Sequence, residues 1–230
     1  MKKILASLLC GSSLAALSAA QSATFNFNSA PAQPVDTFTS NGFSLEIAGL
    51  FSASSLNQNL SSVSLNATPY NILVGPENGI GTGPFSDSEL RNGAGTPKLS
   101  GATLLDITDI QTPKATTASE LDILMSSVDQ ATHEGFLVYG SNQSALKGPA
   151  TLTLLNHGTS GPNDTGSFTV NSNLLKQYTN FYVTADNSFY SSVLLGNGTK
   201  VKAQATPEPT TLVGIALLTL PLLRKRKKSL

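Results

Sequence analysis

Apolar and polar residues alternate over many short stretches of this chain, and turn-forming residues separate the stretches. Phe43–Ala48 and Gly166–Val170 alternate with a period of two, which predicts strands with one buried face. Gly135–Gly140 is instead a continuous apolar run between two glycines, the pattern of a strand inside a core. Helical periodicity is almost absent, so the pattern predicts an all-β protein.

The same pattern places the individual elements. We expect strands at residues 23–28, 43–48, 62–67, 70–74, 103–107, 120–125, 135–140, 151–155, 166–170, 180–185 and 191–195. Asn41-Gly42 is a turn signal ahead of one strand, and residues 173–178 are expected to form one helical turn. Residues 75–101 are rich in Gly, Pro, Asn and Ser, which predicts a long irregular loop.

Many short strands at modest spacing indicate a single β-sandwich with a jelly-roll-like arrangement. A sandwich buries alternate residues between the inner faces of its two sheets. The residues expected in this core are Phe136, Val138, Leu152, Leu154, Tyr182 and Leu194.

The N-terminus has the three parts of a secretory signal peptide. Two lysines follow Met1, Ile4–Leu17 is mostly apolar, and Ser18-Ala19-Ala20 supplies small residues for cleavage. We expect residues 1–20 to be the signal peptide, with cleavage nearer Ala23 as the alternative. Cys10 does not indicate a lipoprotein, because Leu9 stands where lipidation signals need a small residue.

The C-terminus is a second distinct segment. Thr210–Leu223 is an apolar run of 14 residues, which as a helix spans roughly 21 Å. This is short for a hydrocarbon core of about 30 Å. Five cations follow the run and favour a cytoplasmic position for the chain end. The apolar residues are Leu212, Val213, Ile215, Leu217, Leu218, Leu220, Leu222 and Leu223, and the cations are Arg224, Lys225, Arg226, Lys227 and Lys228.

Two hypotheses explain this segment. It is a permanent tail anchor, or it is a transient membrane segment that presents Pro207-Glu208-Pro209 to a processing enzyme outside the cytoplasm. The shortness of the run and Pro221 within it favour the transient segment.

The Pro207-Glu208-Pro209 tripeptide, the short apolar run and the terminal basic cluster together resemble the PEP-CTERM sorting signal of Gram-negative bacteria, over residues 207–228. The resemblance implies processing by an exosortase, a transient stay in the inner membrane, and delivery to the cell surface, outer envelope or extracellular matrix. It also implies association with exopolysaccharide. Within residues 24–206, Asn78–Gly81 ahead of Asp87–Glu89, Phe136–Ser141 and Tyr182–Ala185 look like segments of PEP-CTERM ectodomains.

The net charge of the body differs from that of the two end segments. The formal net charge of zero combines 14 basic and 14 acidic residues, but 7 of the bases lie in the end segments with a single acid, Glu208. Residues 24–206 therefore hold 13 acids and 7 bases, a net charge of −6. An acidic body argues against nucleic acid as a partner. Cys10, the only cysteine, lies in the signal peptide, so the mature chain forms no disulfide.

Candidate catalytic residues are few. His133 and His157 are the only histidines, and neither belongs to a known catalytic spacing, so we interpret both as exposed turn residues. Glu120 and Asp122 would share one face of a strand, as a carboxylate pair or as an ordinary solvated pair. The sequence therefore favours a non-catalytic protein, with a glycoside-active enzyme as the alternative.

One loop could bind a metal ion. Glu77, Asp87 and Glu89 lie among loop carbonyls that could ligate calcium, although the spacing is not that of an EF-hand. The alternative is a solvated acidic loop, and no other cofactor is expected.

Two functions remain open at this point. The first is an exported, non-catalytic surface or extracellular-matrix protein that associates with exopolysaccharide. The second is a secreted carbohydrate-binding or carbohydrate-active domain.

Overall fold

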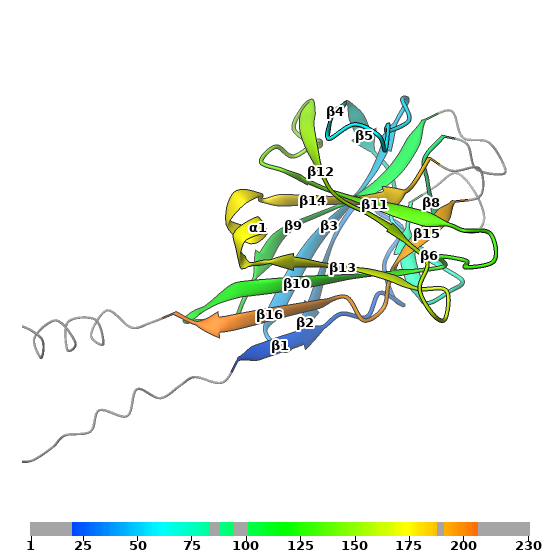
Figure 1. Cartoon of the computed structure of the whole chain (residues 1–230). Coiled ribbons are helices and arrows are strands. Elements are labelled where there is room, and N and C mark those ends of the chain that lie inside the picture. The colour runs from blue at the N-terminus through cyan, green and yellow to red at the C-terminus, as the bar shows by residue number, and fades with distance from the viewer. Residues whose placement is uncertain (1–19, 83–87, 94–100, 188–190, 207–230) are drawn as a thin grey trace, which may run out of the picture. The chain divides into compact units, whose positions relative to one another are not determined.

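Two antiparallel β-sheets make up most of the protein, as Figure 1 shows. The structure, a computed structural model, describes residues 20–82, 88–93, 101–187 and 191–206. Its strands belong to one compact unit, Ala20–Gln204, apart from the last residue of the final strand. The all-β expectation is confirmed, and the pair of sheets is consistent with a β-sandwich.

Each sheet contains eight strands. The first sheet has the order β1-β16-β10-β15-β7-β6, with β13 paired to β10 and β8 paired to β15. Its strands are β1 (Gln21–Thr24), β6 (Leu73–Gly75), β7 (Gly79–Gly81), β8 (Leu90–Arg91), β10 (Thr116–Ser126), β13 (Gly166–Asn171), β15 (Ser192–Gly196) and β16 (Lys200–Ala205).

The second sheet has the order β2-β3-β9-β14-β11-β12-β4, with β5 paired to β3. Its strands are β2 (Val35–Ser40), β3 (Phe43–Ser52), β4 (Ser62–Leu65), β5 (Ala67–Pro69), β9 (Ala102–Gln111), β11 (Gly135–Ser141), β12 (Ala150–Thr159) and β14 (Asn180–Ala185).

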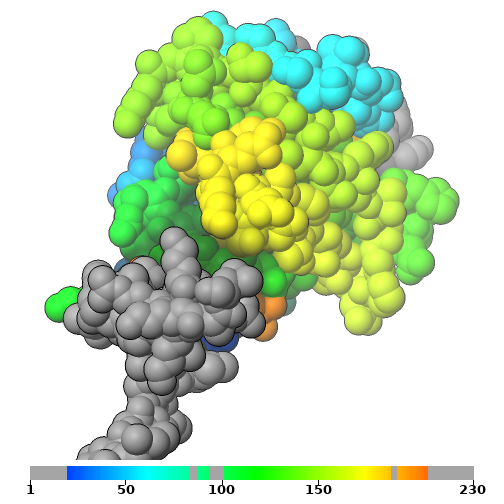
Figure 2. All heavy atoms as spheres, turned by 60° about the vertical axis from the view of Figure 1, so that its left-hand side comes forward, coloured from blue at the N-terminus to red at the C-terminus, as the bar shows by residue number. Residues whose placement is uncertain are grey.

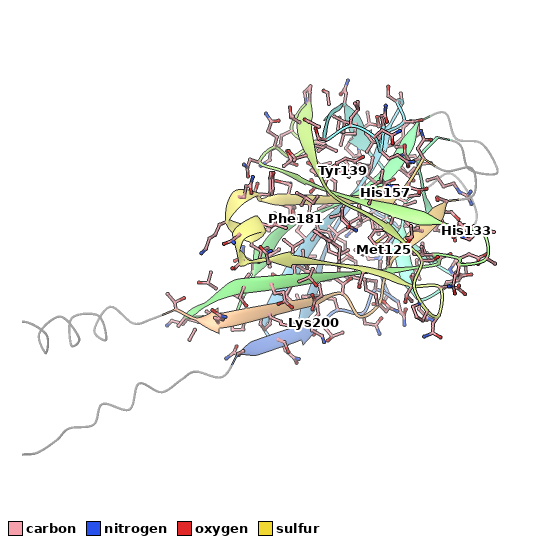
Figure 3. The ribbon with its side chains drawn as sticks, viewed as in Figure 1. Met125, His133, Tyr139, His157, Phe181 and Lys200 are labelled. Carbon is pink, nitrogen blue, oxygen red and sulfur yellow. The ribbon has the colours of Figure 1, made fainter. Side chains whose placement is uncertain are left out.

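The main hydrophobic core takes residues from both sheets. Leu121, Ile123 and Met125 alternate along β10 of the first sheet and are fully buried in the same cluster as Phe181 of β14. Figure 3 shows Met125 and Phe181 in the interior, between the two sheets. The ring of Phe136 also lies here, at 1% exposure. Alternate residues of facing strands thus form one apolar layer, as sheet packing requires.

A second cluster lies on the opposite face of the second sheet. It contains alternate residues of the same strands, including Leu104 of β9, Tyr139 of β11 and Tyr182 of β14. Residues of the segments next to β3 and β11, such as Leu56 and Ala145, complete it. The central strands β11 and β14 are therefore buried on both faces, which explains the continuous apolar run of β11, as expected from its sequence.

The expected core residues divide between these layers. Phe136 and Val138 lie in the main core as predicted, whereas Leu152 and Tyr182 lie in the second cluster. Leu194 is fully buried, and its side chain packs against the glycines of β6 and β7. The prediction for Leu154 is wrong, because it is only partly buried at the margin of the second cluster. The register of β12 against β11 shifts between Val138 and Tyr139, so strict alternation does not hold there.

The Asn41-Gly42 turn joins β2 to β3, with Asn41 at φ 50° and Gly42 at φ 78°. Two positive φ angles in a two-residue connection are those of a type I′ hairpin. The alternating pattern did not find β2, since only Phe38 of its six residues is buried. Edge strands with one buried residue have little apolar periodicity.

Two further expectations are wrong, and one strand was not predicted. The 75–101 segment is not one irregular loop, because β7 and β8 lie within it. β12 continues through residues 156–158, where a turn was expected. β16 has no counterpart among the predicted strands, although it pairs with both β1 and β10.

The expected helical turn is confirmed as α1 (Ser172–Gln177), the only helix among the described residues. Asn171 caps it, and its side-chain oxygen accepts hydrogen bonds from the backbone N–H groups of Asn173 and Leu174. None of its residues is buried, and Figure 2 shows the yellow residues of this region at the molecular surface.

The expected signal peptide up to residue 19 and the sorting signal at 207–228 lie outside the described residues. Within the described part of the chain, we find no helix with the length and apolar character to span a membrane.

Candidate functional site

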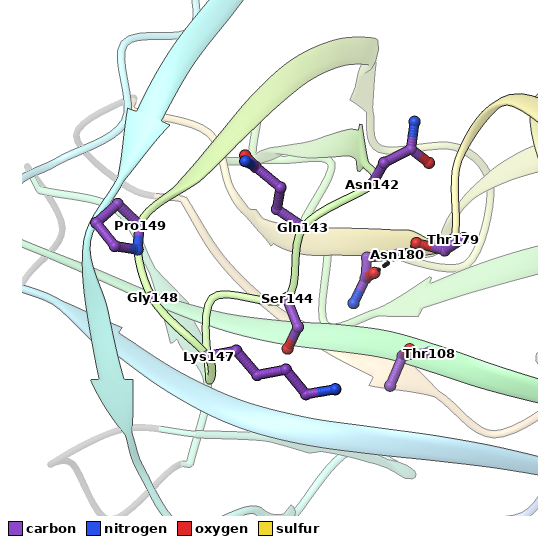
Figure 4. Close-up of a pocket in the computed structure, with 9 residues that line it drawn as sticks. All are labelled: Thr108, Asn142, Gln143, Ser144, Lys147, Gly148, Pro149, Thr179 and Asn180. Atoms are coloured by element: carbon purple, nitrogen blue, oxygen red, sulfur yellow. Dashed lines mark hydrogen bonds between the residues drawn. The ribbon is translucent and has the colours of Figure 1, made fainter.

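An open polar pocket of about 490 Å³ lies beside the connection between β11 and β12. Figure 4 shows how this connection, the end of β9 and the start of β14 surround it. The residues that line it are Thr108, Asn142, Gln143, Ser144, Lys147, Gly148, Pro149, Thr179 and Asn180. Among these residues there is no carboxylate and no aromatic ring, so amides, hydroxyls and one ammonium group define its chemistry.

Asn180 is the buried floor of the pocket, with 4% of its surface exposed. Its Nδ2 group donates to both carboxylate oxygens of Asp106, at 3.1 and 3.0 Å. Its Oδ1 accepts a hydrogen bond of 2.8 Å from the hydroxyl of Thr179, the dashed line in Figure 4. The Asn180 side chain is therefore held in one orientation, and its amide presents a fixed polar group to the pocket.

Asp106 lies directly behind this amide and has no exposed surface. It stands opposite Tyr182 in the pairing of β9 with β14, on the outer face of the second sheet. Burial raises the pKa of Asp106 to about 7, although the hydrogen bonds from Asn180 lower it, and the charge of Glu46 raises it further. Near neutral pH this carboxyl group thus exists in both protonation states.

Tyr182 fixes the connection that forms one wall of the pocket. Its hydroxyl donates to the backbone carbonyl of Gln143 at 2.7 Å and accepts from the backbone N–H of Ala145 at 2.9 Å. Burial, followed by the charge of Asp106, raises the pKa of Tyr182 above its ordinary value. The hydroxyl therefore stays protonated and keeps both bonds.

Gln143 and Lys147 complete the wall. The Gln143 side-chain oxygen accepts from the backbone N–H of Thr151 at 2.9 Å, and its amide nitrogen bonds to no other described residue. The backbone N–H of Lys147 donates to the carbonyl of Ser144 at 3.0 Å, so a turn carries the lysine. In Figure 4 the Lys147 side chain extends in the direction of Thr108.

A second polar cluster lies at the other end of β11 and contains Glu89, one of the three calcium candidates. Glu89 accepts hydrogen bonds from Arg91 at 3.3 Å and from the hydroxyl of Ser127. Glu134 accepts from the backbone N–H of Asp129 at 2.8 Å. Burial raises the pKa of Glu134 to about 7, and nearby Glu89 and Asp129 add to this effect.

Glu77, the second calcium candidate, makes no contact with this cluster among the described residues. Glu77 is exposed in the turn between β6 and β7, and Asp87 lies outside the described residues. In the described ranges, no three His, Cys, Asp or Glu side chains are grouped so that they could hold a metal ion. The calcium site remains a prediction.

The two histidines have different surroundings. His133 is exposed in a turn before β11, as expected. The expectation of a turn for His157 is wrong, because it lies within β12, where its Nε2 is 3.1 Å from Oδ2 of the buried Asp186. Figure 3 labels both histidines, one in the turn and one on its strand.

Glu120 and Asp122 share one face of β10, as predicted. Both form ion pairs with Lys202 of β16, and Asp122 also accepts from the hydroxyl of Thr169 at 2.7 Å. All three charged side chains are partly exposed. The structure thus places these carboxylates in a surface ion-pair group of the first sheet, outside the pocket.

The pocket was not predicted from the sequence. Two features point to it: an aspartate between the apolar residues Leu105 and Ile107 of β9, and a polar, glycine-containing turn directly after the most apolar strand. Neither feature indicates that Asn180, more than 70 residues from Asp106, completes the site, since sheet pairing alone brings them together.

Comparisons of the chain with known protein families, with curated proteins and with solved structures found no match. The fold and the pocket define an all-β protein with a polar surface site. A function must therefore be inferred from the polar groups that line this pocket.

Proposed function

We propose that this chain is an exported, non-catalytic surface or extracellular-matrix protein whose body binds a saccharide at the pocket beside Asn180. The observation that carries the proposal is the lining of that pocket. Amides and hydroxyls surround an opening with no carboxylate among its described lining residues, and such groups match the hydroxyls of a sugar.

We further propose that the body is a jelly-roll β-sandwich, and the strand order supports this. β9, β14, β11 and β12 are neighbours in that order in one sheet, while β10 of the other sheet pairs with β13, β15 and β16. The chain changes sheet after β9, β10, β12, β13 and β14. Such alternation is typical of double-sheet jelly rolls, which include lectin domains.

Export and sorting rest on the two end segments. The signal peptide at residues 1–20 would bring the body across the inner membrane, and the PEP-CTERM-like segment at 207–228 would deliver it to an exosortase-type enzyme. Exopolysaccharide at the cell surface would then be the saccharide that the protein meets.

The chemistry of the body supports a non-catalytic role. The side chain of His157 bonds with Asp186 alone, and that of His133 makes no hydrogen bond among the described residues. Glycoside hydrolysis uses two carboxyl groups that face the substrate, whereas the described lining of the pocket has none.

A glycan array and a reducing-sugar assay on the purified full chain test this proposal. We expect saturable binding without release of reducing ends. Asn142→Ala removes an exposed amide of the pocket and should weaken binding, whereas Asn66→Ala removes an exposed amide elsewhere and should not. Release of reducing ends would favour the carbohydrate-active alternative, and absence of binding to every glycan would refute the saccharide site.

A further inference from the structure

Among the described residues that line the pocket, Lys147 is the only one with a charged side chain. It forms no ion pair and its ammonium group makes no hydrogen bond within the described part of the chain. By contrast, Lys202 is paired with Glu120 and Asp122 in the first sheet. An ammonium group beside neutral lining groups attracts an anion at that point.

The neighbours of Lys147 are suited to a ligand that also carries hydroxyl groups. The amide nitrogen of Gln143 makes no hydrogen bond among the described residues, and the amide oxygen is bonded to the backbone N–H of Thr151. The side chains of Asn142 and Ser144 make no hydrogen bond among the described residues. Both can donate hydrogen bonds to a ligand or accept them from it. The pocket thus offers one cation and several uncharged polar groups together.

The net charge of the body would not attract an anion to the pocket. Residues 24–206 carry a net charge of −6, so at long range the body repels anions. At ordinary ionic strength, charges more than about 8–10 Å apart are largely screened, and the adjacent ammonium group then dominates. Affinity for an anion should therefore depend on Lys147 in particular.

We propose that the pocket binds a sugar that carries a carboxylate, a hexuronate residue, with Lys147 binding the carboxylate and the side chains of Asn142, Gln143 and Ser144 binding hydroxyls. This inference rests on the proposed saccharide-binding function and specifies its ligand. A hydrogen bond to a charged group contributes more than one between neutral groups, so the carboxylate should provide most of the selectivity.

Glucuronic acid and glucose form a matched pair of probes, because they differ only at C6, where one has a carboxylate and the other a hydroxymethyl group. We expect NMR titration of the full chain to give a dissociation constant about tenfold lower for glucuronic acid, the scale of one charge-assisted hydrogen bond. Lys147→Gln should remove this preference and leave glucose binding within about twofold. Higher salt should weaken glucuronic acid binding alone.

Lys200→Gln is the matched control, because it removes the same charge from β16 in the other sheet. We expect it to leave the preference for glucuronic acid unchanged. Equal affinity for the two sugars, or a preference that survives Lys147→Gln, would overturn the inference while the saccharide site stands. If neither sugar nor any array glycan bound, the proposed function itself would fail.

Discussion

Asp106 combines complete burial with an ionisable group, a combination that folded proteins rarely contain without a partner. The Asn180 amide supplies hydrogen bonds to both oxygens but brings no positive charge. Desolvation therefore dominates, and the protonated form is favoured up to about pH 7.

This pKa predicts how stability depends on pH. The folded state binds the Asp106 proton more tightly than the unfolded state does, because the pKa rises from 3.8 to about 7 on folding. The free energy of unfolding should therefore be greatest near pH 4 and should fall as the pH rises to 7, by at most about 4 kcal/mol from this group. Glu134 acts in the same direction.

Thermal unfolding followed by circular dichroism between pH 4 and pH 8 checks this expectation. Asp106→Asn should flatten the pH dependence, whereas Glu77→Gln, which removes an exposed carboxyl group, should leave it intact. An unchanged slope in Asp106→Asn would contradict the role of this carboxyl group.

Tyr139 and Tyr182 form a natural comparison, since they lie opposite each other on β11 and β14 and both are fully buried. The Tyr182 hydroxyl makes two backbone hydrogen bonds, whereas that of Tyr139 has no partner among the described residues. We expect Tyr182→Phe to cost about 1–3 kcal/mol and Tyr139→Phe to cost nothing or to stabilise slightly.

Chemical denaturation of the two variants measures these differences. Hydrogen exchange should also become faster at Ala145 in Tyr182→Phe, because its backbone N–H loses its acceptor. Equal destabilisation by the two substitutions would contradict the role given to the two backbone hydrogen bonds of the Tyr182 hydroxyl.

At the level of elements, β1 bears on where the proposed signal peptide would end. β1 pairs with β16 from Gln21, opposite Ala203, to Thr24, opposite Lys200, and Ala23 is 1% exposed. Cleavage after Ala20 would keep this strand, whereas cleavage after Ala23 would remove three of its four residues.

We therefore expect the mature chain to begin at Gln21, which mass spectrometry of its N-terminal peptide would establish. A variant whose mature chain begins at Thr24 should be less stable by about 2 kcal/mol, since it loses several backbone hydrogen bonds and a buried side chain. If the mature chain began at Thr24 and were equally stable, β1 would have no structural role.

For the whole molecule, the decisive question is whether the C-terminal segment remains in the mature protein. If residues 207–228 are a sorting signal, the mature protein should end near Pro207–Pro209 and lack Leu222 and Arg224. Intact-mass measurement of the protein from its native envelope checks this. A mature chain that retains Leu222 and Arg224 would instead support the tail anchor.

Much of the fold could be predicted from local patterns. β3, β10, β11 and β14 were found because each buries alternate or continuous apolar residues, and α1 was found next to its Asn171 cap. β2 was missed because only one of its residues is buried, so pairing with its neighbour and not apolar periodicity makes it a strand. β16 was missed although Val201 and Ala203 alternate with polar residues and are buried.

The sequence by itself determined the all-β class, most strand positions and the contrast between an acidic body and a basic C-terminus, because these depend on the order and composition of neighbouring residues. Only the tertiary structure decided that β11 and β14 are buried on both faces and that Asn180 meets Asp106 beside Lys147. Those contacts join residues far apart in the chain, and the register of β9, β14 and β11 sets them. Local sequence patterns do not encode that register.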